Sequence, residues 1–206
     1  STLSSLRARA GDDAVRAYAE ANRTAQEWVR REVVDVAGLD ERRPAFTYST
    51  TAQGDEGIRS EAEASGVAGI DVEVLERADI GLPFRVTSAL RLGDQTQVNP
   101  MRLLEDLVGK ARAAGVHLAH GRRMTDVRQE EAGLRVETTD GAITCDRLVV
   151  TTGFPVIDRA MMFAKLMPTR QIVGAYTLPE GTTAPDGMFL SLDPVSRSIR
   201  VAEDAD

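Results

Sequence analysis

Cysteine is almost absent from the 206-residue sequence: Cys145 is the only one, so no disulfide can form within the chain. Asp146 follows it and no histidine is near, whereas a reactive thiol needs a cationic neighbour. We therefore interpret Cys145 as a structural thiol. The scarcity of cysteine is typical of a reducing compartment and predicts a cytoplasmic protein.

The sequence also lacks long apolar runs and an excess of basic residues. Its longest apolar run, residues 160–164, is far too short to span a membrane. The first residues do not have the basic and apolar regions of a signal peptide. Lys and Arg number 25 against 32 Asp and Glu, which leaves a net charge of -7. This balance argues against partners that are nucleic acids or anionic membrane surfaces.

Histidine is nearly as scarce as cysteine. His117 and His120 are the only two, and on the strand expected there they would point to opposite faces. They therefore cannot bind one metal together, and no cluster of cysteine or carboxylate residues completes a metal site. We expect no metal.

Hydrophobic residues, at 42%, are frequent enough to bury a core. Asp12 and Asp13 are candidate N-caps for a long helix, which continues with apolar residues at helical spacing until Gly38. β-forming residues and turn residues then alternate along the chain. We expect strands over 44–50, 82–86 and 89–92, and a short helix over 56–65.

Residues 99–153 carry the clearest pattern. Asn99 can cap a helix, Pro100 suits its first position, and Gly115 suits the residue after its end. Asp140 and Gly141 form a typical hairpin turn. We expect a helix over 100–114, a strand over 116–120, a meander of strands over 122–129, 134–138 and 142–145, and an apolar strand over 147–151 of the kind buried in parallel sheets. A short helix around 158–166 and strands over 171–177, 188–192 and 198–202 should follow.

Several segments carry a resemblance to a known family. They are residues 94–100 (Asp-Gln-Thr-Gln-Val-Asn-Pro), the helix after them, residues 121–127, the meander, and residues 148–153 (Leu-Val-Val-Thr-Thr-Gly). Together they resemble the glycine/D-amino-acid oxidase-like family, which are FAD-dependent oxidoreductases of the glutathione-reductase-2 type. The opening, residues 11–23, is similar to the same family. The likeness covers almost the whole chain and is strongest over residues 90–155.

The resemblance implies the cofactor FAD and an α/β fold, or α+β at the level of the sheets. In such a fold a partial, Rossmann-like FAD-binding domain with a β-meander accompanies a mostly antiparallel substrate domain. The corresponding division of the chain is residues 1–41 as a helical part of the FAD domain, 42–98 as the first part of the substrate domain, 99–154 as the main part of the FAD domain, and 155–206 as the second part of the substrate domain.

The resemblance also implies cofactor-binding residues. The apolar strand would run toward the dinucleotide, which places Thr151, Thr152 and Gly153 beside it. A glycine there lets the backbone approach a bulky cofactor. Met124 stands where the family usually has a valine whose main chain contacts the adenine, so the expected contact of Met124 is through its main chain only.

Oxidation of an amine by a flavin asks the protein mainly to bind and orient the substrate. An arginine suits a substrate carboxylate, and aromatic side chains suit the walls of the site. Arg170 and Arg200 are candidates for the first role, and Tyr48 and Phe189 for the second. Each also has a plain structural interpretation, as a surface arginine or a core aromatic. No catalytic residue is identified.

One feature of the family is missing. No two glycines in the sequence are separated by a single residue, so the phosphate-binding motif Gly-x-Gly-x-x-Gly cannot occur. We expect the chain to be an internal piece of a longer oxidoreductase that binds FAD weakly or not at all by itself. Apolar surface and sheet edges left uncovered in such a piece predict self-association.

Three functions remain open on the sequence. The first is oxidation of a C–N bond of an amino acid or related amine, a small-molecule substrate, by the FAD-dependent parent protein. The second is a binding or interaction module without catalysis. The third is a flavin hydroxylase or dehydrogenase that acts on a substrate other than an amine.

Overall fold

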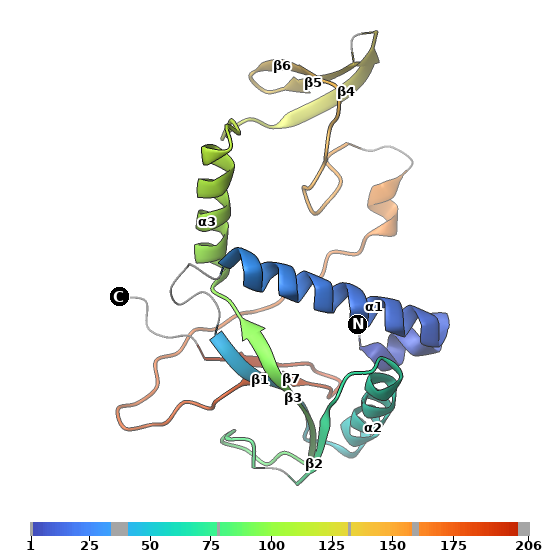
Figure 1. Cartoon of the computed structure of the whole chain (residues 1–206), viewed down its shortest axis with the longest axis vertical. Coiled ribbons are helices and arrows are strands. Elements are labelled where there is room, and N and C mark those ends of the chain that lie inside the picture. Colours follow the sequence, from blue (N-terminus) through green and yellow to red (C-terminus); the bar gives the residue numbers. More distant parts are fainter. Residues whose placement is uncertain (1, 34–40, 78, 132, 158–160, 202–206) are drawn as a thin grey trace. The chain divides into compact units, whose positions relative to one another are not determined.

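The computed structural model describes residues 2–33, 41–77, 79–131, 133–157 and 161–201. The chain divides into two compact units (Figure 1). The first unit consists of Ser1–Lys110 and Leu178–Asp206, and the second of Ala111–Thr177.

The first unit begins with the long helix α1 (Leu3–Val33), which bends at Gly11 (φ 80°, ψ 179°). The start predicted at Asp12 and Asp13 coincides with this break, after which the longer piece of the helix begins, and their capping role stays a prediction. The preceding piece is capped by the carboxylate of Glu61, which accepts hydrogen bonds from the backbone N–H groups of Leu3 (2.8 Å) and Ser4 (2.9 Å). A cap from a residue so distant in the chain leaves no local signal. The predicted end at Gly38 lies outside the described residues.

Loss of this cap gives a first testable prediction. Replacing Glu61 by glutamine removes the charge that complements the helix N-terminus and one of the two acceptor oxygens, so the free energy of unfolding should fall by about 1 kcal/mol. Urea unfolding followed by circular dichroism measures it. Glu56→Gln, at an exposed position of the helix that carries Glu61 (residues 52–67), is the control and should change little. Equal effects of the two variants would contradict the capping role.

A five-stranded sheet forms the centre of the first unit, in the order β2-β3-β1-β7-β8. The pairing is antiparallel except between β1 and β7, which run parallel. The strands are β1 (Glu41–Ser49), β2 (Glu73–Glu76), β3 (Ser88–Gln97), β7 (Met188–Ser191) and β8 (Ser198–Arg200). This confirms the strands expected at 44–50, 89–92, 188–192 and 198–202 apart from their bounds. The strand expected over 82–86 is wrong, since that segment is an irregular loop.

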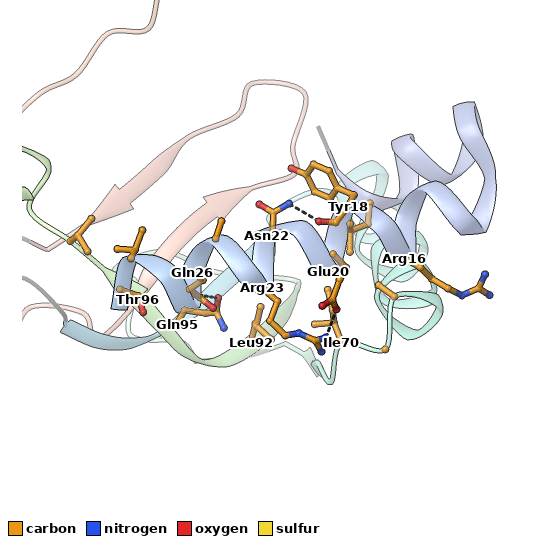
Figure 2. Close-up of a pocket in the computed structure, with 17 residues that line it drawn as sticks. Arg16, Tyr18, Glu20, Asn22, Arg23, Gln26, Ile70, Leu92, Gln95 and Thr96 are labelled. Atoms are coloured by element: carbon orange, nitrogen blue, oxygen red, sulfur yellow. Dashed lines mark hydrogen bonds and ion pairs between the residues drawn. The ribbon is translucent and has the colours of Figure 1, made fainter. Parts of the chain in front are cut away.

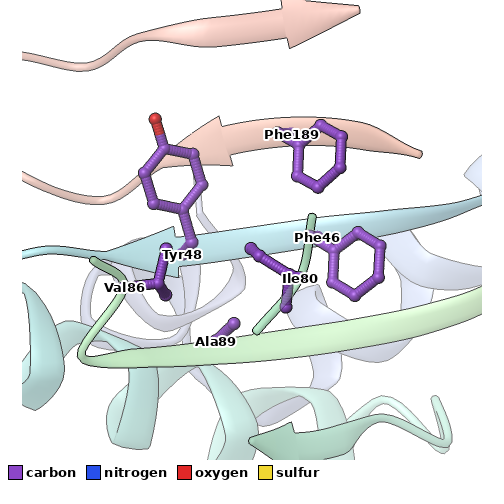
Figure 3. Packing of buried hydrophobic residues seen from close by; sticks show 6 residues of the cluster. All are labelled: Phe46, Tyr48, Ile80, Val86, Ala89 and Phe189. Carbon is purple, nitrogen blue, oxygen red and sulfur yellow. The ribbon is translucent and has the colours of Figure 1, made fainter. Parts of the chain in front are cut away.

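The two faces of this sheet are covered differently. Phe46 and Tyr48 are two residues apart on β1 and therefore point to the same face of the sheet. On that face Phe46 stacks on Phe189, with ring centroids 5.1 Å apart and planes inclined by 6° (Figure 3). Ile80 and Val86, from the irregular loop before β3, complete this cluster of buried side chains. The apolar residues that suggested a strand over 82–86 thus cover one face of the sheet from a loop.

Helix α2 (Ala52–Val67) packs on the other face, toward which Ser49 points because it follows Tyr48 along β1. Thr51 is its N-cap, and its side chain accepts a hydrogen bond from the N–H of Gly54 at 3.1 Å. Ile58 is its most deeply buried large side chain, at 1% exposure. The helix expected over 56–65 is confirmed, with an extra turn at the start.

Helix α3 (Pro100–Ala113) runs from the first unit into the second. The side chain of Asn99 accepts hydrogen bonds from the N–H groups of Met101 (3.0 Å) and Arg102 (3.3 Å). Gly115 follows the helix with φ 83°, a left-handed conformation that suits glycine. The predicted cap and stop are both confirmed.

The second unit contains the expected meander, a three-stranded antiparallel sheet in the order β4-β5-β6. Its strands are β4 (Met124–Glu130), β5 (Gly133–Thr138) and β6 (Gly141–Cys145). Val127 and Val136 lie opposite each other on neighbouring strands and are the buried hydrophobic residues described in this unit. Gly141 has φ 96° at the predicted hairpin turn.

Three further strands expected in the second unit are wrong: residues 116–120, 147–151 and 171–177 form no ladder. Val149 is 82% exposed although its neighbours are apolar. A strand needs a neighbour for its backbone hydrogen bonds, and none of the described strands pairs with these segments. The helix expected around 158–166 is only a 3₁₀ turn, η1 (Met162–Lys165), and residues 158–160 lie outside the described part.

Candidate functional site

A hollow of about 640 Å³ lies between α1 and β3 in the first unit (Figure 2). Leu92 and Val98 of the β3 segment and Ile70 contribute apolar surface to it. The side chain of Gln26 on α1 reaches across and donates a hydrogen bond to Gln95 on β3 (3.1 Å). A volume of this size is typical of pockets for small molecules.

The charges around this hollow are largely neutralised within the protein. Arg23 forms an ion pair with Glu20, and Arg16 with Asp13 (2.7 Å). Arg30 joins α1 to the end of β3 through hydrogen bonds to Thr96 Oγ1 and to the backbone carbonyl at position 94, both 2.6 Å. No cysteine or histidine occurs among the described residues that line the hollow. The hollow thus has the size of a small-molecule pocket, and its described lining offers no evident nucleophile.

The four residues expected to contact substrate are not brought together. Tyr48 and Phe189 lie in the hydrophobic core at 2% exposure each, which agrees with their plain structural interpretation. Arg200 pairs in register with Met188, so it lies on the sheet face opposite Phe189, and it is exposed. Arg170 is exposed in an irregular segment of the second unit. Their substrate roles stay predictions.

The residues expected to contact FAD lie in the second unit. Met124 is half-buried at the start of β4. Thr151, Thr152 and Gly153 are exposed, and the Thr152 hydroxyl donates a hydrogen bond to the carbonyl of Phe154 (2.7 Å). Gly153 has φ 72°, and no atom lies within 4 Å of where a Cβ would be.

These features fit one edge of a dinucleotide site. The backbone at Gly153 is open to close approach by a large group, and its conformation requires glycine. The donors for a pyrophosphate are not supplied, because the sequence contains no Gly-x-Gly-x-x-Gly turn. The contacts of Met124 and of residues 151–153 with FAD therefore stay predictions.

The structure also contains a hydrogen-bonded cluster around Asp193 that was not expected from the sequence. This carboxylate, 8% exposed, accepts hydrogen bonds from the hydroxyls of Thr50 (2.7 Å), Thr51 (2.8 Å) and Ser49 (3.1 Å) and from the N–H of Thr50 (3.2 Å). Burial by itself would raise the pKa of Asp193, but the hydrogen bonds from Thr50 and Thr51 outweigh it and lower the pKa. The cluster joins the end of β7 to the start of α2.

A second carboxylate lies nearby in the first turn of α2. Asp55 accepts hydrogen bonds from the hydroxyls of Ser88 (2.5 Å) and Thr87 (2.6 Å), which lower its pKa. The run Ser-Thr-Thr at 49–51, shortly before Asp55, is a helix-capping pattern and could have indicated the local part of this arrangement. Hydrogen-bond donors of the chain already occupy the oxygens of both carboxylates, so we assign Asp193 and Asp55 a structural role.

Neither a metal-ligand cluster nor a membrane-spanning helix occurs in the described part of the chain. The described residues contain no group of three or more His, Cys, Asp or Glu side chains placed to hold a metal ion. Within the same described ranges, no helix has the length and hydropathy needed to cross a bilayer.

Comparison with known proteins assigns the family. A family model described as FAD dependent oxidoreductase matches residues 3–200. A curated relative, the "Probable oxidoreductase OrdL" of Rhizobium meliloti (strain 1021), is 29% identical over 102 residues, which are 45% of this chain and 24% of the relative.

Two solved structures share the fold. Glycine oxidase from Geobacillus kaustophilus has a TM-score of 0.51 at 19% identity, over 62% of this chain and 36% of that one. Glycine oxidase from Bacillus cereus ATCC 14579 has a TM-score of 0.52 at 16% identity, over 65% and 38%. The chain thus spans well under half the length of these relatives, and its mixed α/β fold agrees with the expected class. The match over residues 3–200 shows that the chain belongs to the family of FAD-dependent oxidoreductases.

Proposed function

We propose that the protein carrying this chain oxidises a C–N bond of an amino acid or a related amine, with FAD as the electron acceptor. The family match over residues 3–200 carries the proposal. The two solved structures that share the fold support the amine substrate, because both are glycine oxidases. Oxidation removes a hydride and a proton from the substrate, and water then releases the carbonyl product and ammonia.

The chemistry that FAD supplies when bound is acceptance of the hydride. The part of this chain is to bind and orient. The open backbone at Thr151, Thr152 and Gly153 would lie along the dinucleotide, and the main chain of Met124 would contact the adenine. Arg170 and Arg200 stay candidates for the substrate carboxylate, since neither side chain has an ion-pair partner in the described part of the chain.

A flavin absorbance spectrum tests the proposal. The protein that carries the chain, purified with its flavin, should lose its visible flavin band when amino acids or amines are added without oxygen. Regeneration of the band by oxygen would identify the acceptor. A protein without flavin, or one reduced only by substrates that are not amines, would contradict the proposal, and the second result would favour the hydroxylase or dehydrogenase.

FAD binding by the 206-residue chain alone tests the consequence of the missing phosphate-binding turn. We expect weak or no FAD binding in a titration followed by flavin fluorescence, because pyrophosphate recognition rests on that turn. Stoichiometric copurification of FAD with the chain would contradict this expectation. Light scattering on the same sample tests the predicted self-association.

A further inference from the structure

A second hollow, of about 240 Å³, lies under the loop that joins β2 to β3. It is separate from the groove between α1 and β3, and none of the residues discussed above for FAD or substrate lines it. Its lining consists of Arg77, Asp79, Leu82, Phe84, Arg85 and Val86.

Two guanidinium groups without partners stand at this hollow. Neither the side chain of Arg77 nor that of Arg85 makes a hydrogen bond or ion pair with any part of the chain that the structure describes. Arg91, on β3 of the same sheet, is by contrast paired with Glu73 (3.4 Å). Both arginines at the hollow, Arg77 and Arg85, are exposed. Their guanidinium groups are thus available to an anion from solution.

The backbone at Arg77 adds a second observation. Arg77 has φ 49°, a left-handed conformation that is unfavourable for a side-chain-bearing residue and that recurs at binding sites. Its N–H donates a hydrogen bond to the carbonyl of Thr87 (2.8 Å), which holds the turn in place. The conformation thus fixes where the Arg77 side chain leaves the loop.

The remaining wall is apolar and firmly supported. Phe84 is 43% exposed, and its ring lies on that of Tyr48 with centroids 5.9 Å apart and planes inclined by 45°. Tyr48 and Val86 belong to the buried cluster of the sheet, as Figure 3 shows. An exposed aromatic on a rigid base, next to two free guanidinium groups, suits a ligand that has both a charged end and an apolar end.

Asp79 limits which anion fits. Its carboxylate lines the hollow and accepts a hydrogen bond from the N–H of Gly81 (3.1 Å). A negative group so close disfavours a ligand with two negative charges more than a ligand with one. Arginine is also well matched to a planar carboxylate, which can accept two parallel hydrogen bonds.

We propose that this hollow binds a small monocarboxylate with an apolar tail, its carboxylate between Arg77 and Arg85 and its tail against Phe84. The site does not rest on the proposed oxidase function, because it needs neither flavin nor turnover. An oxidase substrate and a non-reacting effector could both carry such a group, and activity assays on the flavin-loaded protein would tell these two sources apart.

Calorimetric titration of the full chain with hexanoate tests the proposal. We expect saturable binding that weakens about tenfold in Arg77→Gln and again in Arg85→Gln, since a charge-assisted hydrogen bond contributes about 1.4 kcal/mol or more. Arg102→Gln, an exposed arginine on α3, is the matched control and should bind as the unaltered chain does. Phe84→Ala should weaken hexanoate but not acetate.

Three results would overturn the proposal: no saturable binding of hexanoate, binding that both arginine substitutions leave unchanged, or inorganic phosphate bound as tightly as hexanoate. Circular dichroism verifies that each variant is folded. Should Arg77→Gln disturb its turn, Arg85→Lys serves as the second variant. Lysine keeps the positive charge but cannot donate two parallel hydrogen bonds as the planar guanidinium group does. This variant should therefore bind hexanoate more weakly than the unaltered chain.

Discussion

Replacing Asp193 by alanine is expected to lower the free energy of unfolding of the first unit by about 2 kcal/mol. The substitution removes a charged acceptor, itself 8% exposed, from the hydroxyls of Thr50 and Thr51 and from the N–H of Thr50, and hydrogen bonds to charged groups contribute more than neutral ones. Thr50 and Thr51 are exposed, so water replaces part of what is lost, and the Ser49 hydroxyl keeps its hydrogen bond to the carbonyl of Thr51 (2.8 Å). Urea unfolding followed by circular dichroism gives the difference.

A surface aspartate provides the control for Asp193. The side chain of Asp13 is fully exposed and paired with Arg16 (2.7 Å), so Asp13→Ala should change the free energy of unfolding by less than about 0.5 kcal/mol. If the two alanine variants unfold at the same urea concentration, the cluster around Asp193 does not hold β7 to α2.

The lowered pKa of Asp193 adds a pH dependence to the same prediction. A carboxyl group with a lower pKa in the folded state binds protons more readily when unfolded. Its stabilising contribution is present above the unfolded pKa, about 3.9, and is lost as the pH falls through the lower folded value. Asp193→Asn should therefore flatten the acid side of the stability curve. Asp55, whose pKa is lowered as well, remains in this variant, so part of the loss of stability at acid pH should remain.

Replacing Gly54 by alanine is expected to destabilise the protein by about 2 kcal/mol, although alanine is the better helix former. A Cβ at this position of α2 would overlap Ser49 Oγ and lie 2.5 Å from Asp193 Oδ1. Both groups are buried and hydrogen-bonded, so they cannot yield without breaking the cluster. The same unfolding measurement reports the loss.

Gly57, one turn further along α2, is the matched control. A Cβ there would make ordinary contact with Leu192 Cδ1 at 3.5 Å. Gly57→Ala should therefore stabilise the protein by up to about 1 kcal/mol, the usual gain in a helix. The two substitutions are chemically identical and should differ in sign. A gain in stability for Gly54→Ala would show that the space around Ser49 is larger than the structure indicates.

The elements predicted correctly are those whose signals are local. Asn99 caps α3, Gly115 ends it, and Gly141 turns β5 into β6, each through contacts within a few residues. The cap of α1 by Glu61 was missed for the opposite reason, because the two partners are far apart in the chain. The apolar pattern of residues 147–151 suggested a buried strand, but pattern alone does not supply a neighbouring strand.

For the candidate site, too, the local signals were predictable and the arrangement in space was not. The segments that resemble FAD-dependent oxidoreductases led to the family that the comparisons show. The individual substrate residues did not follow from the sequence: Tyr48 and Phe189 are aromatic in either role, and only burial distinguishes a core residue from the wall of a site. That Arg77 and Arg85 have no side-chain partner among the described residues is equally invisible in sequence, since neighbours in space decide it.

By itself, then, the order of residues determined the family, the meander and the capped helix α3, because motifs, turn residues and caps act over short stretches of chain. Only the tertiary structure decided which polar groups are buried together around Asp193, which aromatics form the core, and which arginines are left without a partner. Those properties depend on groups from distant segments meeting at hydrogen-bond distance, where the removal of water determines whether a polar contact stabilises the fold or destabilises it.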